Sequence, residues 1–232
     1  MNRKGIIMIC LLLCFIISIQ AASAADMDNA TLTTDQLDTV DSVSEANDLD
    51  TYSSSQNNDV LTAGGAGNFT ELQNLINNAT GPSITLDKDY EFSDGDAGLI
   101  NGIVISKNIE IIGNGHKLNG NNLSAIFSVT QGNVVLNNIT FINGHSDTSA
   151  GAIHSSGDAA LTISNCNFID NHGVNAGAVH LSGDSSIDNC NFINNNATKD
   201  GGALFVEGDG CTVSNSTFTN NTAGDDGGAI NW

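Results

Sequence analysis

The sequence predicts an all-β fold, a parallel β-helix in which each repeat forms one coil of a solenoid. Three markers recur together in the second half of the chain, a phenylalanine motif, a Gly-Ala motif and a Gly-Asp pair, at intervals of 24 to 27 residues. Periods of 20 to 50 residues indicate a solenoid, propeller or array. The repeats contain short β-branched runs, many Gly and Asn, and no long helix, and this pattern favours the β-helix.

Residues 1–24 have the layout of a secretory signal peptide. Arg3 and Lys4 precede an apolar run from Ile6 to Ile19, and small residues lead to a cleavage site after Ala24. The alternative is a membrane anchor, but the apolar run is shorter than the ~18 residues that spanning requires. We therefore expect a secreted or cell-surface protein.

Residues 25–67 read as an acidic, low-complexity linker. This segment has nine acids and no Lys or Arg, so it cannot bury enough apolar surface to offset its ordering entropy, and we expect it to be disordered. Removal of the signal peptide leaves 4 Lys, no Arg and 26 acids, a net charge of −22. Such a charge argues against nucleic acid and against anionic membrane surfaces as partners, because both are bound through Lys and Arg.

Residues 68–102 are expected to form an N-terminal cap made of a short helix and one strand. The helix has Thr70 and Gln73 at the spacing of a capping box, and the strand is expected over Ser83 to Ser93. The apolar residues of the helix share one face at helical spacing: Phe69, Leu72, Leu75 and Ile76.

Residues 103–232 are expected to form the β-helix repeats, about five coils with the irregular ones included. Coils stack at about 4.8 Å, so equivalent side chains should form ladders. The predicted aromatic ladder in the interior is Phe141, Phe168, Phe192 and Phe218. Asparagine tolerates left-handed backbone at turns, and the predicted amide-to-amide ladder is Asn138, Asn165, Asn189 and Asn215.

Cys166 and Cys190 occupy the same repeat position, in NCNFIDN and NCNFINN, while the neighbouring coils have Ile139 and Ser216 there. Parallel side chains keep the Cβ atoms near the coil spacing, farther apart than a disulfide prefers. We therefore predict a ladder of buried free thiols rather than a disulfide or a metal site.

Two kinds of side chain are metal candidates. Asp158, Asp184 and Asp209 follow Gly in successive coils, and calcium would relieve the repulsion of stacked carboxylates. The alternative, which we favour, is ordinary turn chemistry at Gly-Asp pairs. The histidine pairs, His145 with His172 and His154 with His180, could each share a metal, but zinc sites need three or four converging ligands. For these we favour simple duplication of the repeat, and we expect no other cofactor.

Asn-x-Ser/Thr triplets make an exported chain a candidate glycoprotein. We prefer Asn78, Asn196 and Asn220 as acceptors, the last two because they fall in predicted turns, whereas Asn138 and Asn215 belong to the predicted ladder. The alternative is that a chain rich in Asn and Thr produces this triplet freely.

GGAI and FxxN are the signature of the chlamydial polymorphic outer-membrane protein repeat, which the second half of this chain resembles. Phe141 departs from the motif because Gly144 stands where Asn belongs. The matching pairs are Phe168 with Asn171, Phe192 with Asn195 and Phe218 with Asn221.

Residues 68–232 also resemble the adhesin-like surface proteins of methanogenic archaea, through FTELQNLINNATG, ITLDKDY, IEIIGNGHKLNGNN and ITFING in this order. The resemblance implies a right-handed, pectin-lyase-like β-helix, export and an adhesive role. Relatives are typically far longer, so we expect a chain truncated at its C-terminus. Its open coil edge near Trp232 would then favour self-association.

We therefore expect an exported adhesin-like protein, without a catalytic residue, that binds host or microbial surface glycans or proteins through a side face of the β-helix. The alternatives are a structural surface spacer and a polysaccharide-active lyase or glycosidase. A lyase usually needs a basic proton acceptor, and basic residues are scarce here. A glycosidase needs two carboxylates that flank the scissile bond, and the sequence shows no such pair distinct from the repeat.

Overall fold

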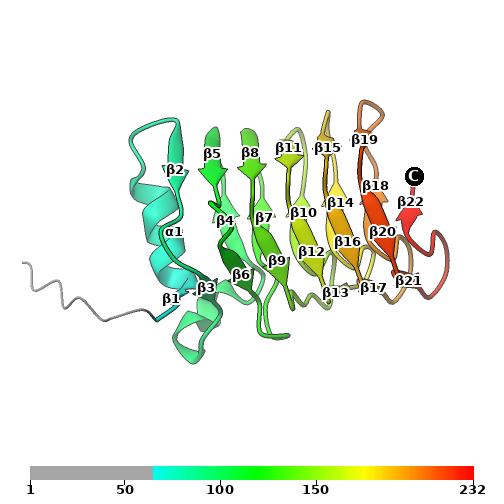
Figure 1. Cartoon of the computed structure of the whole chain (residues 1–232), viewed down its shortest axis with the longest axis horizontal. Coiled ribbons are helices and arrows are strands. Elements are labelled where there is room, and N and C mark those ends of the chain that lie inside the picture. Colours follow the sequence, from blue (N-terminus) through cyan, green and yellow to red (C-terminus); the bar gives the residue numbers. More distant parts are fainter. Residues whose placement is uncertain (1–64) are drawn as a thin grey trace, which may run out of the picture. The chain divides into compact units, whose positions relative to one another are not determined.

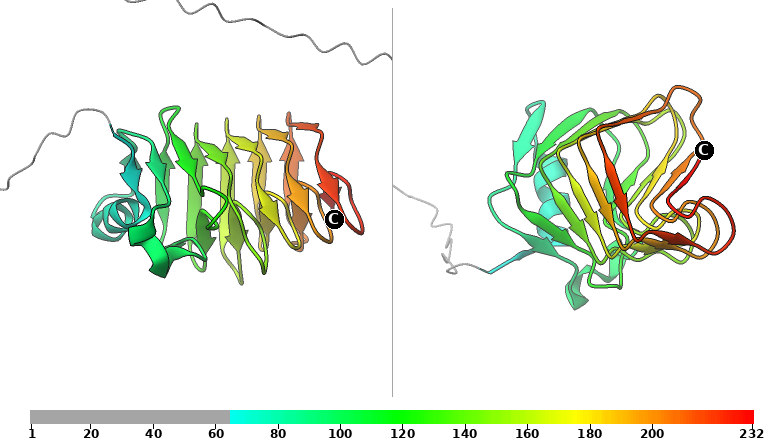
Figure 2. Two further views of the ribbon diagram at one scale, coloured as in Figure 1. Left: turned by 90° about the horizontal axis from the view of Figure 1, so that it is seen from below. Right: turned by 45° about the vertical axis from the view of Figure 1, so that its right-hand side comes forward.

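Short parallel strands, stacked coil upon coil, form a β-solenoid of about six turns (Figure 1). The computed structural model describes residues 65–232, so the predicted signal peptide and nearly all of the predicted linker lie outside the described residues. Figure 2 shows the coils following one another along a single axis. The predicted parallel β-solenoid and its repeat character are thus confirmed.

Four ladders of parallel strands run along the solenoid. Sheet A contains β1 (Gly67–Asn68), β3 (Tyr90–Glu91), β6 (Lys117–Asn119), β9 (Thr140–Ile142), β12 (Asn167–Ile169), β16 (Asn191–Ile193) and β20 (Thr217–Thr219). Sheet B contains β2 (Ser83–Thr85), β5 (Ile109–Ile112), β8 (Asn133–Asn137), β11 (Ala160–Ser164), β15 (Ser186–Asp188) and β19 (Thr212–Ser214). Sheet C contains β4 (Ile103–Ile105), β7 (Phe127–Val129), β10 (Ile153–Ser155), β14 (Val179–Leu181), β18 (Leu204–Val206) and β22 (Ile230–Asn231). The short sheet D contains β13 (His172–Gly173), β17 (Asn196–Ala197) and β21 (Thr222–Ala223).

The four repeat phenylalanines form a stack inside the solenoid. Their ring centroids are 4.7–4.8 Å apart and their planes lie within 4° of parallel. Phe141, Phe168 and Phe192 are fully buried, whereas Phe218 in the last described coils is half-buried. Each buried ring contributes roughly 1.5–3 kcal/mol through the apolar area that it removes from water, so this stack is a main source of stability.

A second buried ladder is made of asparagines, those of the FxxN motif. Asn171 and Asn195 are at most 1% exposed. The Asn195 carboxamide donates to Phe168 O (3.0 Å) in the coil before and to Asn221 Oδ1 (3.0 Å) in the coil after. Its Oδ1 accepts from both the backbone N–H (3.1 Å) and the side-chain amide (2.9 Å) of Asn171. One side chain therefore joins three successive coils.

The ladder ends where Asn gives way to Gly. The backbone N–H of Gly144 donates to Asn171 Oδ1 at 2.8 Å. A Cβ on Gly144 would lie 2.2 Å from the carbonyl oxygen of Gly151, so no side chain fits there. This clash explains the departure of the Phe141 repeat from FxxN.

The predicted asparagine ladder at the turns has the expected backbone conformation, but its side-chain amides do not form a continuous chain. Its members are Asn138, Asn165, Asn189 and Asn215. All four residues have left-handed φ angles between 49° and 56°. Asn189 donates to Asn165 Oδ1 (2.7 Å), but Asn165 donates to Asn137 and Asn215 to Asp188. The expectation of amide-to-amide bonds throughout is therefore wrong, because the ends of the sheet B strands offer competing acceptors.

Helix α1 (Phe69–Asn78) lies at the N-terminal end of the solenoid (Figure 1). Phe69, Leu72 and Ile76 are buried in the core, while Leu75 is exposed. No helix among residues 65–232 has the length and apolar character needed to cross a membrane.

The predicted capping box of the helix is wrong. Asn68 is the N-cap residue, and its side chain accepts from Glu71 N (2.8 Å). The Gln73 amide instead pairs with the backbone of Val104, accepting at 2.7 Å and donating at 3.0 Å. The Gln73 side chain thereby pairs with the backbone N–H and C=O of Val104 in β4. These groups would otherwise be unpaired, because β4 is the edge strand of sheet C.

The region between Ser83 and Ser93 forms two strands in two sheets, not the single strand predicted. β2 pairs with β5 in sheet B, and β3 pairs with β6 in sheet A. The residues expected to form a cap thus contribute strands to the solenoid itself, which gives about one coil more than expected.

Asp96 anchors the start of α1 to the 3₁₀ helix η1 (Asp94–Leu99). Its buried carboxylate accepts from the backbone N–H and hydroxyl of Thr70 (2.8 and 2.6 Å) and from those of Ser93 (2.9 and 2.8 Å). The N–H of Phe69 lies 3.3 Å away and also donates. Burial would raise the pKa of Asp96, but the hydrogen bonds from Thr70 and Ser93 outweigh it and hold the pKa below its usual range.

Replacing Asp96 with Ala should lower the free energy of unfolding by about 3 kcal/mol, because several buried donors lose one charged acceptor. Because the pKa of Asp96 is lower in the folded state, its contribution should be complete above about pH 4 and lost as pH falls through the folded value. Urea unfolding at pH 7 and at pH 3 would measure both effects.

Asp94→Ala is the matched control, since Asp94 is an exposed acid of the same short helix. It should change stability by less than about 0.5 kcal/mol. Equal effects of the two substitutions would contradict the anchoring role of Asp96.

Candidate functional site

The outer surface of sheet A has two continuous rows of side chains. Alternate residues of a strand point to opposite faces, so the inward phenylalanines force their neighbours outward. The amide-hydroxyl row, paired in register from β9 to β20, is Thr140, Asn167, Asn191 and Thr217. The isoleucine row beside it is Ile142, Ile169 and Ile193, followed by Thr219.

Hydrogen bonds hold the amide-hydroxyl row in order. Asn191 Nδ2 donates to Asn167 Oδ1 (2.9 Å), and Thr217 Oγ1 donates to Asn191 Oδ1 (2.7 Å). Asn167 Nδ2 donates more weakly to Thr140 Oγ1 (3.4 Å). A carboxamide has two N–H donors and two acceptor positions, so each Asn keeps hydrogen-bonding capacity for a ligand.

The isoleucine row adds apolar contact. Ile142, Ile169 and Ile193 are all partly exposed, although isoleucine is usually buried. We call the two rows together the sheet A face. It presents ordered polar groups and an apolar strip side by side, repeated at the spacing of the coils.

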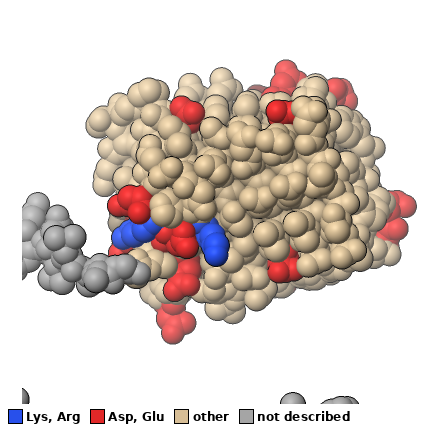
Figure 3. All heavy atoms as spheres, in the orientation of Figure 1, with Lys and Arg blue, Asp and Glu red and all other residues tan. Residues whose placement is uncertain are grey.

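Charges are sparse on this face. Figure 3 shows charged side chains gathered over the N-terminal strands β3 and β6, while the surface over β9, β12, β16 and β20 is largely uncharged. Lys117 precedes the amide-hydroxyl row in register, and Asp170 follows the end of β12. The sheet A face therefore suits a neutral partner although the chain as a whole is acidic.

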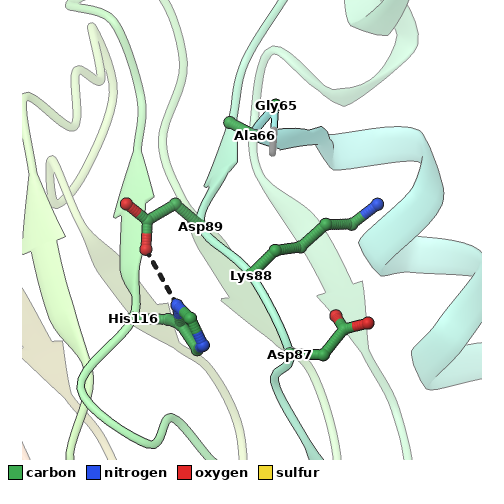
Figure 4. A pocket seen from close by; sticks show the side chains of 6 residues that line it. All are labelled: Gly65, Ala66, Asp87, Lys88, Asp89 and His116. Carbon is green, nitrogen blue, oxygen red and sulfur yellow. Dashed lines mark hydrogen bonds and ion pairs between the residues drawn. The ribbon is translucent and has the colours of Figure 1, made fainter. Parts of the chain in front are cut away.

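A pocket of about 320 Å³ beside the first coils is lined by charged groups that no other coil repeats (Figure 4). His116 Nδ1 lies 3.0 Å from Asp89 Oδ1, which also accepts from the backbone N–H of Lys117 at 2.9 Å. The Lys117 N–H bond is the largest influence on the pKa of Asp89, and with His116 it lowers that pKa despite partial burial. This cluster could not be predicted from the sequence, because Asp89 and His116 are unlike residues that the repeat does not duplicate.

The other charged groups of the pocket are already paired. Lys88 bonds to Glu71 at 3.0 Å, and the Tyr90 hydroxyl lies 3.2 Å from Asp87 Oδ1. Burial, with the nearby Asp87 charge, raises the pKa of Tyr90 to about 12. In Figure 4 the Asp89 carboxylate points to His116, and the Asp87 carboxylate points elsewhere. The two carboxylates are thus not arranged to flank one bond.

The predicted calcium ligands do not converge. Asp158, Asp184 and Asp209 are all exposed in turns between sheets C and B. Asp158 and Asp184 line one surface depression of about 500 Å³, which Asp209 does not reach. Among residues 65–232, no three His, Cys, Asp or Glu side chains form a metal-binding group.

The three glycosylation candidates differ in exposure. Asn78 is exposed at the end of α1, and Asn220 is exposed at a left-handed turn after β20. Asn196 lies in strand β17, not in the predicted turn, and is half-buried with its amide bonded to Thr222. A glycan on Asn196 would have to displace that bond, so Asn78 and Asn220 are the more accessible positions.

The three cysteines of the described chain, Cys166, Cys190 and Cys211, are buried and free. The Cys166 and Cys190 thiols donate to the backbone oxygens of Ser164 and Asp188, each at 3.2 Å. The adjacent Cys190 sulfur and burial raise the pKa of Cys166. Both sulfur atoms are therefore placed as hydrogen-bond donors in the packed interior.

No protein-family model, curated protein or solved structure matches the chain. The described residues define a parallel β-solenoid with one uncharged, regularly patterned side face and one charged pocket near its N-terminal end.

Because reagents reach a buried thiol slowly, Cys166, Cys190 and Cys211 should resist alkylation by iodoacetamide in the folded protein. All three should become fully labelled after unfolding without reductant. Peptide mapping by mass spectrometry would assign each site. Failure of Cys166 and Cys190 to react until a reductant is added would show a disulfide and contradict the thiol ladder.

Proposed function

We propose that the protein is an exported, non-catalytic surface protein that binds a neutral glycan along the sheet A face. The observation that carries the proposal is the pair of rows on that face, where Asn and Thr groups alternate with half-exposed isoleucines at one repeat per coil. A repeating surface suits a repeating polymer, because one contact is multiplied along the length of the ligand.

The chemistry of the rows matches that of a sugar chain. Sugar hydroxyls exchange hydrogen bonds with carboxamides and hydroxyls, such as those of Asn167, Asn191 and Thr217. The C–H faces of sugar rings can lie against the isoleucine row, which gains from the apolar area removed from water. An ordered row also lowers the entropy cost of binding, since Asn191 is already held by two neighbours.

The proposed location, the handedness of the β-helix and the adhesive role rest on the sequence. The basic and apolar pattern of residues 1–24 supports a secreted or cell-surface location, with α1 covering the N-terminal end of a right-handed β-helix. The resemblance to archaeal adhesin-like proteins supports adhesion to host or microbial surfaces, and exposed Asn78 and Asn220 fit a glycoprotein.

A polysaccharide-active enzyme is the second candidate, and one observation favours it. Catalysis needs groups that occur once, and the Asp89–His116 pair is not duplicated by the repeat. Release of reducing sugar or unsaturated product from a polysaccharide panel would support this candidate, provided that His116→Ala abolished the release. A structural spacer, the third candidate, would bind no glycan saturably.

Substituting Asn191 with Ala should weaken binding to a neutral polysaccharide about five- to thirtyfold, because one to two hydrogen bonds of about 1 kcal/mol each are lost. A glycan array would identify the ligand, and biolayer interferometry with the immobilised polysaccharide would give the affinities.

Thr162→Ala is the matched control, because Thr162 is exposed on the outer side of sheet B, in the coil before Asn191. Its affinity should equal that of the unmodified protein. The proposal fails if no neutral glycan binds saturably, or if the two substitutions weaken binding equally.

A further inference from the structure

Two histidines face outward next to each other on sheet C. His154 in β10 and His180 in β14 are in register, and their strand neighbours Ile153 and Val179 are fully buried. The rings are 4.9 Å apart and tilted by 48°, so they do not stack face to face. The Nδ1 atoms of the two rings lie close to each other.

Three donor atoms meet there. The Nδ1 atoms of His154 and His180 are 3.1 Å apart. The hydroxyl oxygen of Ser149 lies 2.8 Å from the first and 3.3 Å from the second. The three atoms therefore form a nearly equilateral triangle of two imidazole nitrogens and one oxygen.

The environment of His180 favours one tautomer of its ring. His180 is 6% exposed, and Phe205 packs edge-on against its ring at 4.9 Å between centroids. Nε2 lies 3.0 Å from Glu207 Oε2, although among the described residues it has no well-aligned hydrogen-bond acceptor. The carboxylate favours a proton on Nε2, which leaves the Nδ1 lone pair free, as in carboxylate–histidine–metal sites.

The triangle matches the first shell of a transition metal. Zinc–nitrogen bonds are about 2.0–2.1 Å long, so two ligands lie about 3.0 Å apart at a right angle and about 3.4 Å apart at the tetrahedral angle. The separations of His180 Nδ1 from His154 Nδ1 (3.1 Å) and from the Ser149 hydroxyl (3.3 Å) fall in this range, and the separation of Ser149 from His154 (2.8 Å) is slightly shorter. We propose that Ser149, His154 and His180 form a binding site for one first-row divalent metal ion such as Zn²⁺, with water in the remaining positions.

The second histidine pair offers a natural control. His145 and His172 stack face to face, with ring centroids 5.3 Å apart and planes 10° from parallel. Parallel stacked rings do not direct their nitrogen lone pairs to a common point. The members of both histidine pairs lie one repeat apart in the sequence. Of these two pairs, only the one beside Ser149 has donor atoms that meet.

The test is isothermal titration of untagged, chelator-treated protein with ZnCl₂, together with thermal melts. We expect saturable binding of one ion per chain and a rise in the melting temperature that EDTA reverses. His154→Gln should weaken binding at least tenfold, whereas His145→Gln should leave it unchanged. Absence of saturable binding, or equal loss in both variants, would overturn the proposal.

A measurement on the unmodified protein covers the case in which His154→Gln does not fold. Diethylpyrocarbonate labels accessible imidazoles, and peptide mapping assigns the modified residues. Zn²⁺ should protect His154 and leave the labelling of His145 unchanged. Labelling of His154 that does not respond to saturating Zn²⁺ would refute the site.

Discussion

One carboxamide per coil, that of the FxxN asparagines Asn171, Asn195 and Asn221, joins each of the C-terminal coils to its neighbours. Asn195 bonds to Phe168 before it and Asn221 after it, and the buried phenylalanines stack in the same register. A shift of one residue would turn every inward side chain outward. It would also leave buried amides without partners, at a cost of about 1–3 kcal/mol each. The pattern of the outer surface depends on this register.

Because the register is fixed, outward residues also align from coil to coil. On sheet A this gives uncharged rows that suit a neutral polymer. On sheet C the same rule places His154 beside His180, but the convergence of their nitrogens also requires Ser149, which lies in the preceding loop. Duplication of the repeat therefore produces regular binding faces, while chemically distinct sites arise where a loop or an end departs from the repeat.

The period of the phenylalanines was enough to predict the solenoid and the aromatic stack, because equivalent positions must align in stacked coils. Side-chain hydrogen bonds were harder to predict. The turn asparagines have the expected left-handed backbone, yet Asn137 and Asp188 redirect their amides. Contacts between distant, unrepeated residues, such as Thr70 with Asp96, leave no periodic signal. The FxxN motif was visible, but its role as a buried ladder follows only from the positions of the neighbouring carbonyl groups.

The most direct test of the amide ladder is urea unfolding of Asn195→Ala and Asn167→Ala. Each substitution removes one asparagine whose side chain bonds to a neighbouring coil. Asn195 is buried, whereas Asn167 is partly exposed on the sheet A face. We predict that Asn195→Ala lowers the free energy of unfolding by at least about 3 kcal/mol, because several buried polar groups lose their hydrogen-bond partner. Asn167→Ala should lower it by about 1 kcal/mol or less. Similar small losses for both would contradict the claim that the buried amides fix the register.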